Sequence, residues 1–160
     1  MSPLLQVLCL IVVANGSPIV IRLVLKTGLN LPVDGGLRFP DDRPLFGPSK
    51  TWTGVITAIA VTGLLAAAIG MPATLGLAIG MSAMAGDLLS SFIKRRLDIA
   101  SSRPAPVLDQ LPESLLPAWL AAGPLGLTIR DIVLVVVLFF IIEIALSHLL
   151  YRCGLRRHPF

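Results

Sequence analysis

The chain has 160 residues, of which 55% are hydrophobic and 14% are charged, and its mean hydropathy is +0.87. A soluble domain of this size needs more polar surface than that to cover its core. The formal net charge of +4 would suggest a nucleic-acid partner in a soluble protein, but in a membrane protein an excess of basic residues on the inner side explains it more simply. We therefore expect an integral membrane protein that binds no nucleic acid.

Five stretches along the chain are apolar enough to predict membrane crossings. A helix needs about 20 mainly apolar residues to cross about 30 Å of hydrocarbon. The fourth stretch is short and contains Pro117, Gly123 and Pro124. The predicted spans are residues 3–25, 54–71, 73–93, 114–128 and 132–151, with polar loops at 26–53 and 94–113, all within one membrane-embedded domain.

The basic residues predict the orientation of these spans, because cytoplasmic loops carry an excess of Lys and Arg. Of the 13 basic residues, four lie in the first polar loop, four in the second and three in the tail after the last span. Five crossings put all three regions on one side, whereas a re-entrant fourth stretch would turn the tail arginines outward. We expect an all-α polytopic fold in the cell membrane, with the N-terminus outside, the C-terminus inside and both polar loops in the cytoplasm.

The sharpest group of chemically capable residues lies at the end of the third span. Asp87, Ser91, Lys94 and Arg95 are spaced so that they share one helix face. Asp87 would lie about 9 Å below the interface, where a lone carboxylate costs about 2.5–3.5 kcal/mol. It should therefore be paired, hydrated or bound to a cation, and a pair that only pins the helix is the simpler alternative.

Asp109 and Glu113 add a second acidic group in the loop that follows. Mg²⁺ takes oxygen ligands and usually combines one or two carboxylates with substrate phosphates. Carboxylates near Lys and Arg therefore indicate a site for Mg²⁺ and phosphate, although a solvated charged loop is an equal alternative. Glu143, within the last span, is more typical of interhelical pairing than of catalysis.

Ser49, Lys50 and Thr51 lie next to the membrane and supply donors suited to phosphate. The segment is not a Walker P-loop, because Pro44 and Ser49 stand where that motif needs glycine. A basic anchor at the headgroup level, with Trp52 as the interfacial aromatic residue, is equally consistent with the spacing.

Polar and small residues inside the predicted spans indicate packing or a groove. Asn15 and Ser17, beside Pro18 in the first span, are typical either of helix packing or of the lining of a substrate groove. The pair Gly76 and Gly80 predicts close helix packing. A similar small face is expected at Gly63, Ala67 and Gly70.

Taken together, these motifs resemble the CDP-archaeol synthases, a small five-helix family related to the CDP-diacylglycerol synthases. The most specific part is Ser91-x-x-Lys94-Arg95 followed about 15 residues later by Asp109. In one departure, Pro112 stands where the family has an Asp, and Glu113 is adjacent to it. The likeness runs nearly end to end, through residues 14–18, 34–36, 47, 50–52, 54, 86–87, 91–96, 104–106, 109–111, 151–152, 154–155 and 159–160.

The resemblance implies a nucleotidyl transfer in which a phosphorylated membrane lipid attacks the α-phosphate of CTP and pyrophosphate leaves. In archaea the lipid of this family is an unsaturated bis-geranylgeranyl glycerol phosphate ether. The resemblance implies that Asp87 and Asp109 bind Mg²⁺, with Glu113 as a further candidate. Phosphate charge would be neutralised by Lys50, Lys94, Arg95 and Arg96. The lipid headgroup would contact Asn15 and Ser17, and further polar contacts would come from Ser49, Thr51 and Ser91.

Three alternatives stay open at this stage. The same chemistry on phosphatidic acid is the nearest, because no residue in the sequence distinguishes ether from acyl tails. A small ion-coupled transporter using Asp87 and Glu143 is another, although the chain has no internal repeat of the kind transporters often show. An inactive structural relative is the third, because of Pro112.

Overall fold

Five α-helices make up most of the described chain in the computed structural model, which covers residues 1–25, 31–100, 103 and 105–152. The predicted all-α class is confirmed. The helices are α1 (Pro3–Leu25), α2 (Trp52–Ala68), α3 (Ala73–Arg96), α4 (Pro106–Leu125) and α5 (Ile129–Arg152). Several residues used for the sequence predictions lie outside the described residues: Lys26, Pro104, Arg156, Arg157 and the segments 154–155 and 159–160.

Two helix boundaries differ from the predictions where polar residues continue a helix. α3 runs on to Arg96, because basic side chains in a last turn interact favourably with the helix dipole. α4 begins at Pro106 and not at residue 114, so the predicted loop 94–113 is wrong in its second half. Proline is suited to the first turn of a helix, where its missing N–H is not needed. Asp109 also lies in that first turn, where a carboxylate is favourable.

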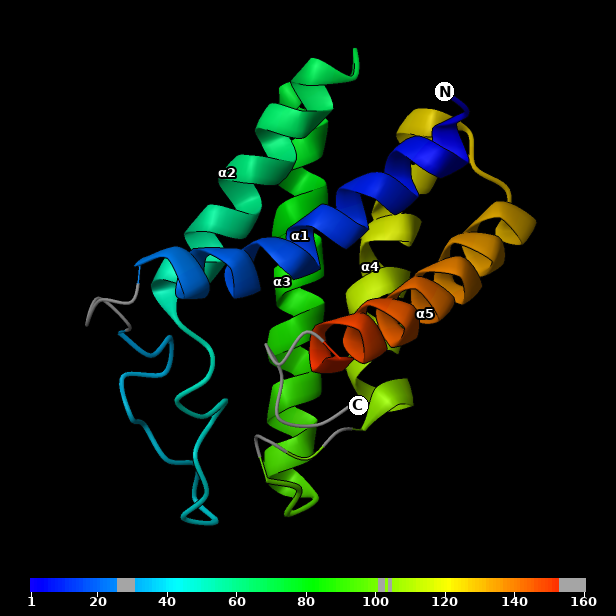
Figure 1. Ribbon diagram of the computed structural model, residues 1–160. Helices are drawn as coiled ribbons and strands as arrows, with labels where there is room; N and C mark the ends of the chain where they lie inside the picture. The colour runs from blue at the N-terminus through cyan, green and yellow to red at the C-terminus, as the bar shows by residue number, and fades with distance from the viewer. Residues whose placement is uncertain (26–30, 101–102, 104, 153–160) are drawn as a thin grey trace.

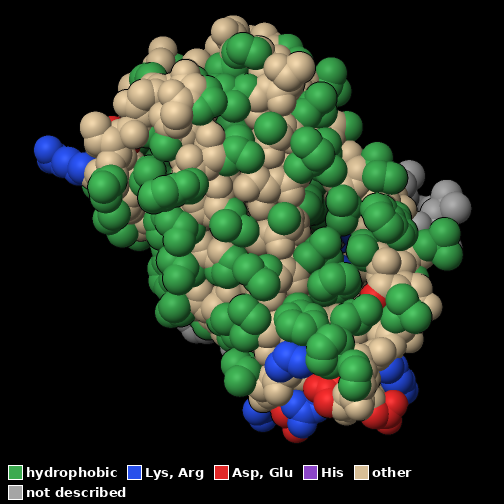
Figure 2. Space-filling model, turned by 180° about the vertical axis from the view of Figure 1, so that it is seen from behind, with side chains coloured by type: hydrophobic (Ala, Val, Ile, Leu, Met, Phe, Trp, Pro, Cys, Tyr) green, Lys and Arg blue, Asp and Glu red, His purple; other side chains and the backbone are tan. Residues whose placement is uncertain are grey.

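The segments between α1 and α2 and between α3 and α4, which are rich in charged residues, lie at one end of the bundle, which we call the polar end (Figure 1). The N-terminus, the α2–α3 turn and the α4–α5 turn lie at the upper end, whereas the segment 31–51 and the α3–α4 connection lie at the lower end. Seen from behind, the charged side chains gather at the lower end, and hydrophobic and uncharged side chains cover most of the remaining face (Figure 2). The polar loops predicted to share one side thus do lie at one end of the bundle.

The helices have the composition of a membrane protein. In the described part of the chain, three helical stretches are long and apolar enough to cross a bilayer: Pro3–Arg22, Ala73–Arg96 and Ile129–Leu149. α2 is a shorter apolar helix. That α2 and α4 also cross the membrane remains a prediction. The orientation of the chain in the membrane remains a prediction too.

Small residues let α2 and α3 approach closely, as predicted for Gly76 and Gly80. A Cβ atom added at Gly76 would lie 2.3 Å from the Cβ of Ala66, and one at Gly80 would lie 3.0 Å from backbone of α2. On the matching face of α2, the predicted Gly63 is confirmed, because a Cβ atom there would lie 2.6 Å from the Leu77 side chain of α3, and Ala66 joins it. The predicted Ala67 and Gly70 are exposed instead. α3 is thereby held against α2 and also contacts α1 and α4.

The segment 31–51 between α1 and α2 folds back on itself and moves its ends together. The N–H of Val33 donates to the carbonyl of Lys50 over 2.8 Å, and the N–H of Trp52 donates to the carbonyl of Leu31 over 3.0 Å. We call this segment the polar hairpin. Its closed base fixes the main chain of Lys50.

Asp34 organises the interior of the polar hairpin. Its buried carboxylate accepts hydrogen bonds from the N–H groups of Gly36 (3.0 Å), Phe46 (3.1 Å) and Gly47 (2.9 Å). Burial alone would raise the pKa of Asp34, but these N–H groups stabilise the ionised form and bring the pKa below its ordinary value of 3.8. Gly47 has a φ of +95°, which only glycine adopts readily.

Candidate active site

Lys50 and Asp87 meet at the polar end of the bundle. The Nζ of Lys50 donates a hydrogen bond to the carboxylate of Asp87 on α3, and each side chain is only about one-fifth to one-quarter exposed (24% and 20%). The closed base of the polar hairpin directs Lys50 toward α3. Two residues predicted for the site, far apart in sequence, are therefore in contact.

Glu113 reaches the same carboxylate from α4. Its side chain is hydrogen-bonded to Asp87, and it also interacts electrostatically with Lys50 and with Glu143 of α5. The contact depends on Gly86, because a Cβ atom there would lie 2.3 Å from the carbonyl oxygen of Pro112. The main chain of α4 thus lies directly against α3 beside Asp87, which the sequence did not reveal.

A second charge pair lies farther along the same two helices. The Nζ of Lys94 is 3.0 Å from the carboxylate of Asp109 and donates to the carbonyl of Arg103 over 2.8 Å. Asp109 also accepts from the N–H of Ala105 over 3.2 Å. Lys94 is almost completely buried, so this pair closes the α3–α4 connection. Asp109 contacts Lys94 here, whereas Asp87 contacts Lys50 and Glu113.

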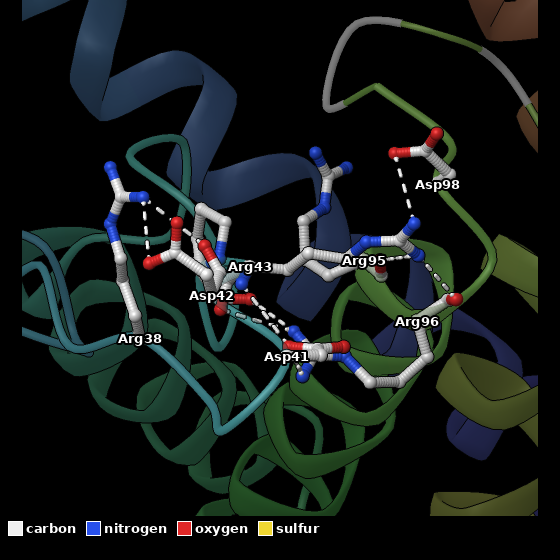
Figure 3. Close-up of polar contacts among 8 residues, drawn as sticks. Arg38, Asp41, Asp42, Arg43, Arg95, Arg96 and Asp98 are labelled. Atoms are coloured by element: carbon white, nitrogen blue, oxygen red, sulfur yellow. Dashed lines mark hydrogen bonds and ion pairs between the residues drawn. The ribbon is translucent and has the colours of Figure 1, made fainter.

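Arg95 and Arg96 point in different directions at the end of α3. Arg96 contacts Asp41 of the polar hairpin over 2.7 Å, whereas the guanidinium of Arg95 points away from the hairpin contacts (Figure 3). Ser91, one turn after Asp87, is buried between the two charge pairs on α3. Sequence analysis missed Asp41, because only the folded hairpin brings it to Arg96.

Ser49 and Thr51 flank Lys50 and have structural contacts. The hydroxyl of Thr51 accepts a hydrogen bond from the N–H of Gly54 over 3.3 Å and so caps α2. The carbonyl of Ser49 accepts from Arg22 of α1 over 2.9 Å, and the Ser49 side chain is exposed. Arg22, near the end of α1, thus holds the chain next to Lys50.

Asn15 and Ser17 bond within their own helix. The side-chain amide of Asn15 donates to the carbonyl of Ile11 over 3.0 Å, and the hydroxyl of Ser17 donates to the carbonyl of Ala14 over 3.3 Å. Both side chains are half-buried on α1. These contacts satisfy polar groups inside an apolar helix and leave further lone pairs available on each side chain.

The donor set around Asp87 fits a divalent cation that is shared with a substrate. In the described residues, no three His, Cys, Asp or Glu side chains come together as a metal-binding group. Asp87 and Glu113 nevertheless place two carboxyl groups in contact, with a positive charge from Lys50 beside them. Mg²⁺ commonly uses one or two carboxylates and takes its other ligands from phosphates and water.

The apolar helices, with carboxylates and lysines gathered at one end of α3, are the arrangement expected of an intramembrane enzyme. The family model of the CDP-archaeol synthases (CarS-like) matches residues 3–160. The chain belongs to the CDP-archaeol synthase family, and the predicted family is confirmed. It is a CTP-dependent nucleotidyltransferase of membrane lipid biosynthesis, so the transporter alternative fails.

Individual relatives agree with this assignment. A CDP-archaeol synthase of Hyperthermus butylicus is 42% identical over 119 residues, which cover 69% of this chain and 68% of the relative. The CDP-archaeol synthase of Aeropyrum pernix is 36% identical over 156 residues, covering 92% of this chain and 86% of the relative. That of Staphylothermus marinus is 36% identical over 110 residues, covering 65% and 59%.

A solved structure of an intramembrane enzyme for archaeal membrane lipids biosynthesis has the same fold. It superposes with a TM-score of 0.75 at 33% sequence identity, over 89% of this chain and 90% of the other. The arrangement of the five helices is therefore shared with an enzyme that works inside a membrane.

Proposed function

We propose that this protein transfers CMP from CTP to a phosphorylated glycerolipid and releases pyrophosphate. Because the relatives are named CDP-archaeol synthases, the proposed lipid is an unsaturated isoprenoid glycerol ether phosphate. The observation that carries the proposal is the contact of Lys50, Asp87 and Glu113 at the polar end of a bundle of this family.

In-line attack on a phosphate needs positioning and charge neutralisation more than covalent chemistry. Lys50 and Lys94 each hold one carboxylate in the described state. We infer that both ammonium groups turn to phosphate oxygens when the nucleotide enters, and that Arg95 joins them. Ser91 would donate its hydroxyl between them.

Asp87 and Glu113 would hold Mg²⁺, and Asp109 is the third proposed ligand, which would first have to release Lys94. When bound, Mg²⁺ neutralises charge on the triphosphate. Before this exchange each charged side chain has an opposite charge beside it, Lys50 with Asp87 and Lys94 with Asp109.

The lipid would approach from the bilayer, with its tails among the apolar faces and its headgroup at the polar end. Asn15 and Ser17 are proposed to line this entrance. The whole chain would form one membrane-embedded unit that crosses the membrane five times, with the N-terminus outside and the C-terminus inside. CTP would then reach the site from the cytoplasm.

The test is turnover of labelled CTP by the purified protein with Mg²⁺ and two lipid phosphates, one with ether-linked isoprenoid chains and one with acyl chains. We expect CDP-lipid and pyrophosphate with the ether lipid in preference to the acyl lipid. Equal or better turnover of phosphatidic acid would replace the proposed lipid by the acyl alternative. No product from either lipid would favour the inactive relative.

A further inference from the structure

The end of α3 binds the main chain of the polar hairpin through Arg96. Its guanidinium donates to the carbonyl of Pro44 over 2.7 Å and to the carbonyl of Arg43 over 3.3 Å. It also pairs with Asp41 at 2.7 Å. One planar guanidinium thus binds three acceptors of the hairpin at once, which a lysine cannot do with the same geometry.

The polar hairpin returns the same contact through Arg43. Its guanidinium donates to the carbonyls of Arg96 over 2.7 Å and of Arg95 over 3.3 Å, and it lies 3.7 Å from Asp98 (Figure 3). The last carbonyls of a helix have no partner within the helix, so a cation from elsewhere satisfies them. We call this reciprocal exchange of Arg43 and Arg96 the arginine clasp.

Two aromatic rings complete the surroundings of Arg96. The guanidinium carbon lies 4.6 Å from the ring centre of Phe39 in the hairpin and 5.1 Å from that of Phe92 on α3. The two rings contact each other edge to face at 5.5 Å. The Arg96 side chain is only 19% exposed. A cation held on this many sides is poorly placed to reach out to a substrate phosphate.

The clasp and Lys50 attach the polar hairpin to α3 at two separate points. Arg96 lies nine residues after Asp87, or about 13 Å along the helix at 1.5 Å per residue. Hydrogen bonds to Asp34 connect the interior of the hairpin, and backbone hydrogen bonds close its base. We therefore expect a displacement of the hairpin at Arg96 to displace Lys50 at its base as well.

We propose that Arg96 and Arg43 are positioning residues that hold Lys50 in register with Asp87, and that Arg96 does not bind the triphosphate. This inference rests on the proposed function of Lys50. It replaces the phosphate-neutralising role that the family resemblance implied for Arg96.

Arg96→Lys tests the clasp, because it keeps the charge and removes the planar fork. A misplacement of about 1 Å can lower a rate about 100-fold, so we expect kcat/KM for CTP to fall about 10- to 100-fold. In a Lys50→Ala background the same substitution should cause no further loss, since there is no ammonium group left to position. Losses that multiply in the double variant would show that Arg96 acts independently of Lys50 and would overturn the proposal.

Arg38→Lys is the matched control. Arg38 also pairs with an aspartate of the hairpin, Asp42, but both side chains are mostly exposed (62% and 85%), so the pair contributes little. We expect its turnover and thermal unfolding to match those of the wild type.

A covalent link provides a second, independent test. Asp41→Cys with Arg96→Cys, in a chain carrying Cys9→Ser and Cys153→Ser, removes the ion pair and allows a short bismaleimide to join the hairpin to α3. Turnover should be low before cross-linking and rise at least severalfold after it. If cross-linking leaves turnover low although the variant unfolds at the wild-type temperature, the clasp proposal is overturned. Absence of pyrophosphate release by the wild type would instead contradict the proposed function.

Discussion

Asp87 is in contact with one positive and one acidic side chain, and the two have opposite effects on it. Lys50 brings a positive charge to its carboxylate, whereas Glu113 brings a second carboxyl group into hydrogen-bonding contact. Like-charged carboxylates in contact repel each other unless a proton or a cation lies between them. Under the proposed function, a divalent cation bound between the two carboxyl groups would remove that repulsion.

Glu113→Gln tests which carboxylate assists Asp87. If Glu113 is a metal ligand, the Mg²⁺ concentration for half-maximal turnover should rise about 10- to 100-fold, the range found when groups around a metal are removed. Asp109→Asn is the matched comparison and should change the Mg²⁺ requirement less, because Asp109 contacts Lys94. The measurement is turnover against Mg²⁺ concentration, and a larger shift for Asp109→Asn would reverse this assignment.

At the residue scale, the sequence predicted which charged side chains gather at the polar end better than it predicted their contacts. The spacing of Asp87, Lys94 and Arg95 on one helix face was sufficient to group them. Which carboxylate Asp87 meets depends on how closely α4 approaches, and one sequence does not encode that distance visibly. The role of Arg96 was hidden for the same reason, because its partners lie on the polar hairpin.

At the scale of elements, α4 is the helix that hydropathy located least well. Its first two turns carry Asp109 and Glu113 together with two prolines, so an apolar window excludes them. Proline at the first position and a carboxylate in the first turn are helix-start signals that would have located its beginning. Both acidic residues therefore lie on a helix and not in a loop.

Gly86→Ala tests the contact between α3 and α4. The new Cβ would meet the backbone of Pro112 and Glu113 at 2.3 to 2.8 Å, so α4 must move. We expect destabilisation of about 1–3 kcal/mol, as for other overpacked sites, and a loss of turnover as Glu113 leaves Asp87. Thermal unfolding in detergent and turnover measure both effects.

Gly123→Ala is the control within α4, because a Cβ there meets nothing within 4 Å. It should be neutral or slightly stabilising, since alanine favours helix more than glycine does. If Gly86→Ala is as harmless as Gly123→Ala, the close approach of the two helices is not required.

The polar hairpin should be sensitive to acid through Asp34. The pKa of Asp34 is lowered in the folded hairpin, so its stabilising contribution is complete above the ordinary value of 3.8 and is lost as the pH falls through the folded value. Fluorescence of Trp52 in a Trp119→Phe background reports this loss. Asp34→Asn should disorder the hairpin at neutral pH and remove that acid transition, and an identical acid transition in both proteins would refute the role of Asp34.

At the scale of the whole molecule, the gathering of charge at one end of the bundle was predictable from the positions of the basic residues. The number of crossings was less certain, because α2 is short and α4 carries acidic residues and prolines. Their depth in the bilayer depends on packing against α3, and composition alone does not specify it.

Labelling of single cysteines tests the five-span arrangement. In a chain with Cys9→Ser and Cys153→Ser, Asp42→Cys lies at the polar end and Arg130→Cys lies near the start of α5, and both positions are exposed or partly so. A membrane-impermeant maleimide added to intact cells should label Arg130→Cys and spare Asp42→Cys until the cells are opened. Labelling of Asp42→Cys from outside would reverse the orientation.

The most direct measurement of the central claim is Mg²⁺-dependent pyrophosphate release from CTP and an ether lipid phosphate by wild-type and Asp87→Asn protein. The wild type should turn over with Mg²⁺ and stop when the metal is chelated. Asp87→Asn should lose about 100-fold or more, the size of effect expected when a group that stabilises transition-state charge is removed, while Asp42→Asn in the exposed part of the polar hairpin retains the wild-type rate. Wild-type turnover by Asp87→Asn would contradict the account.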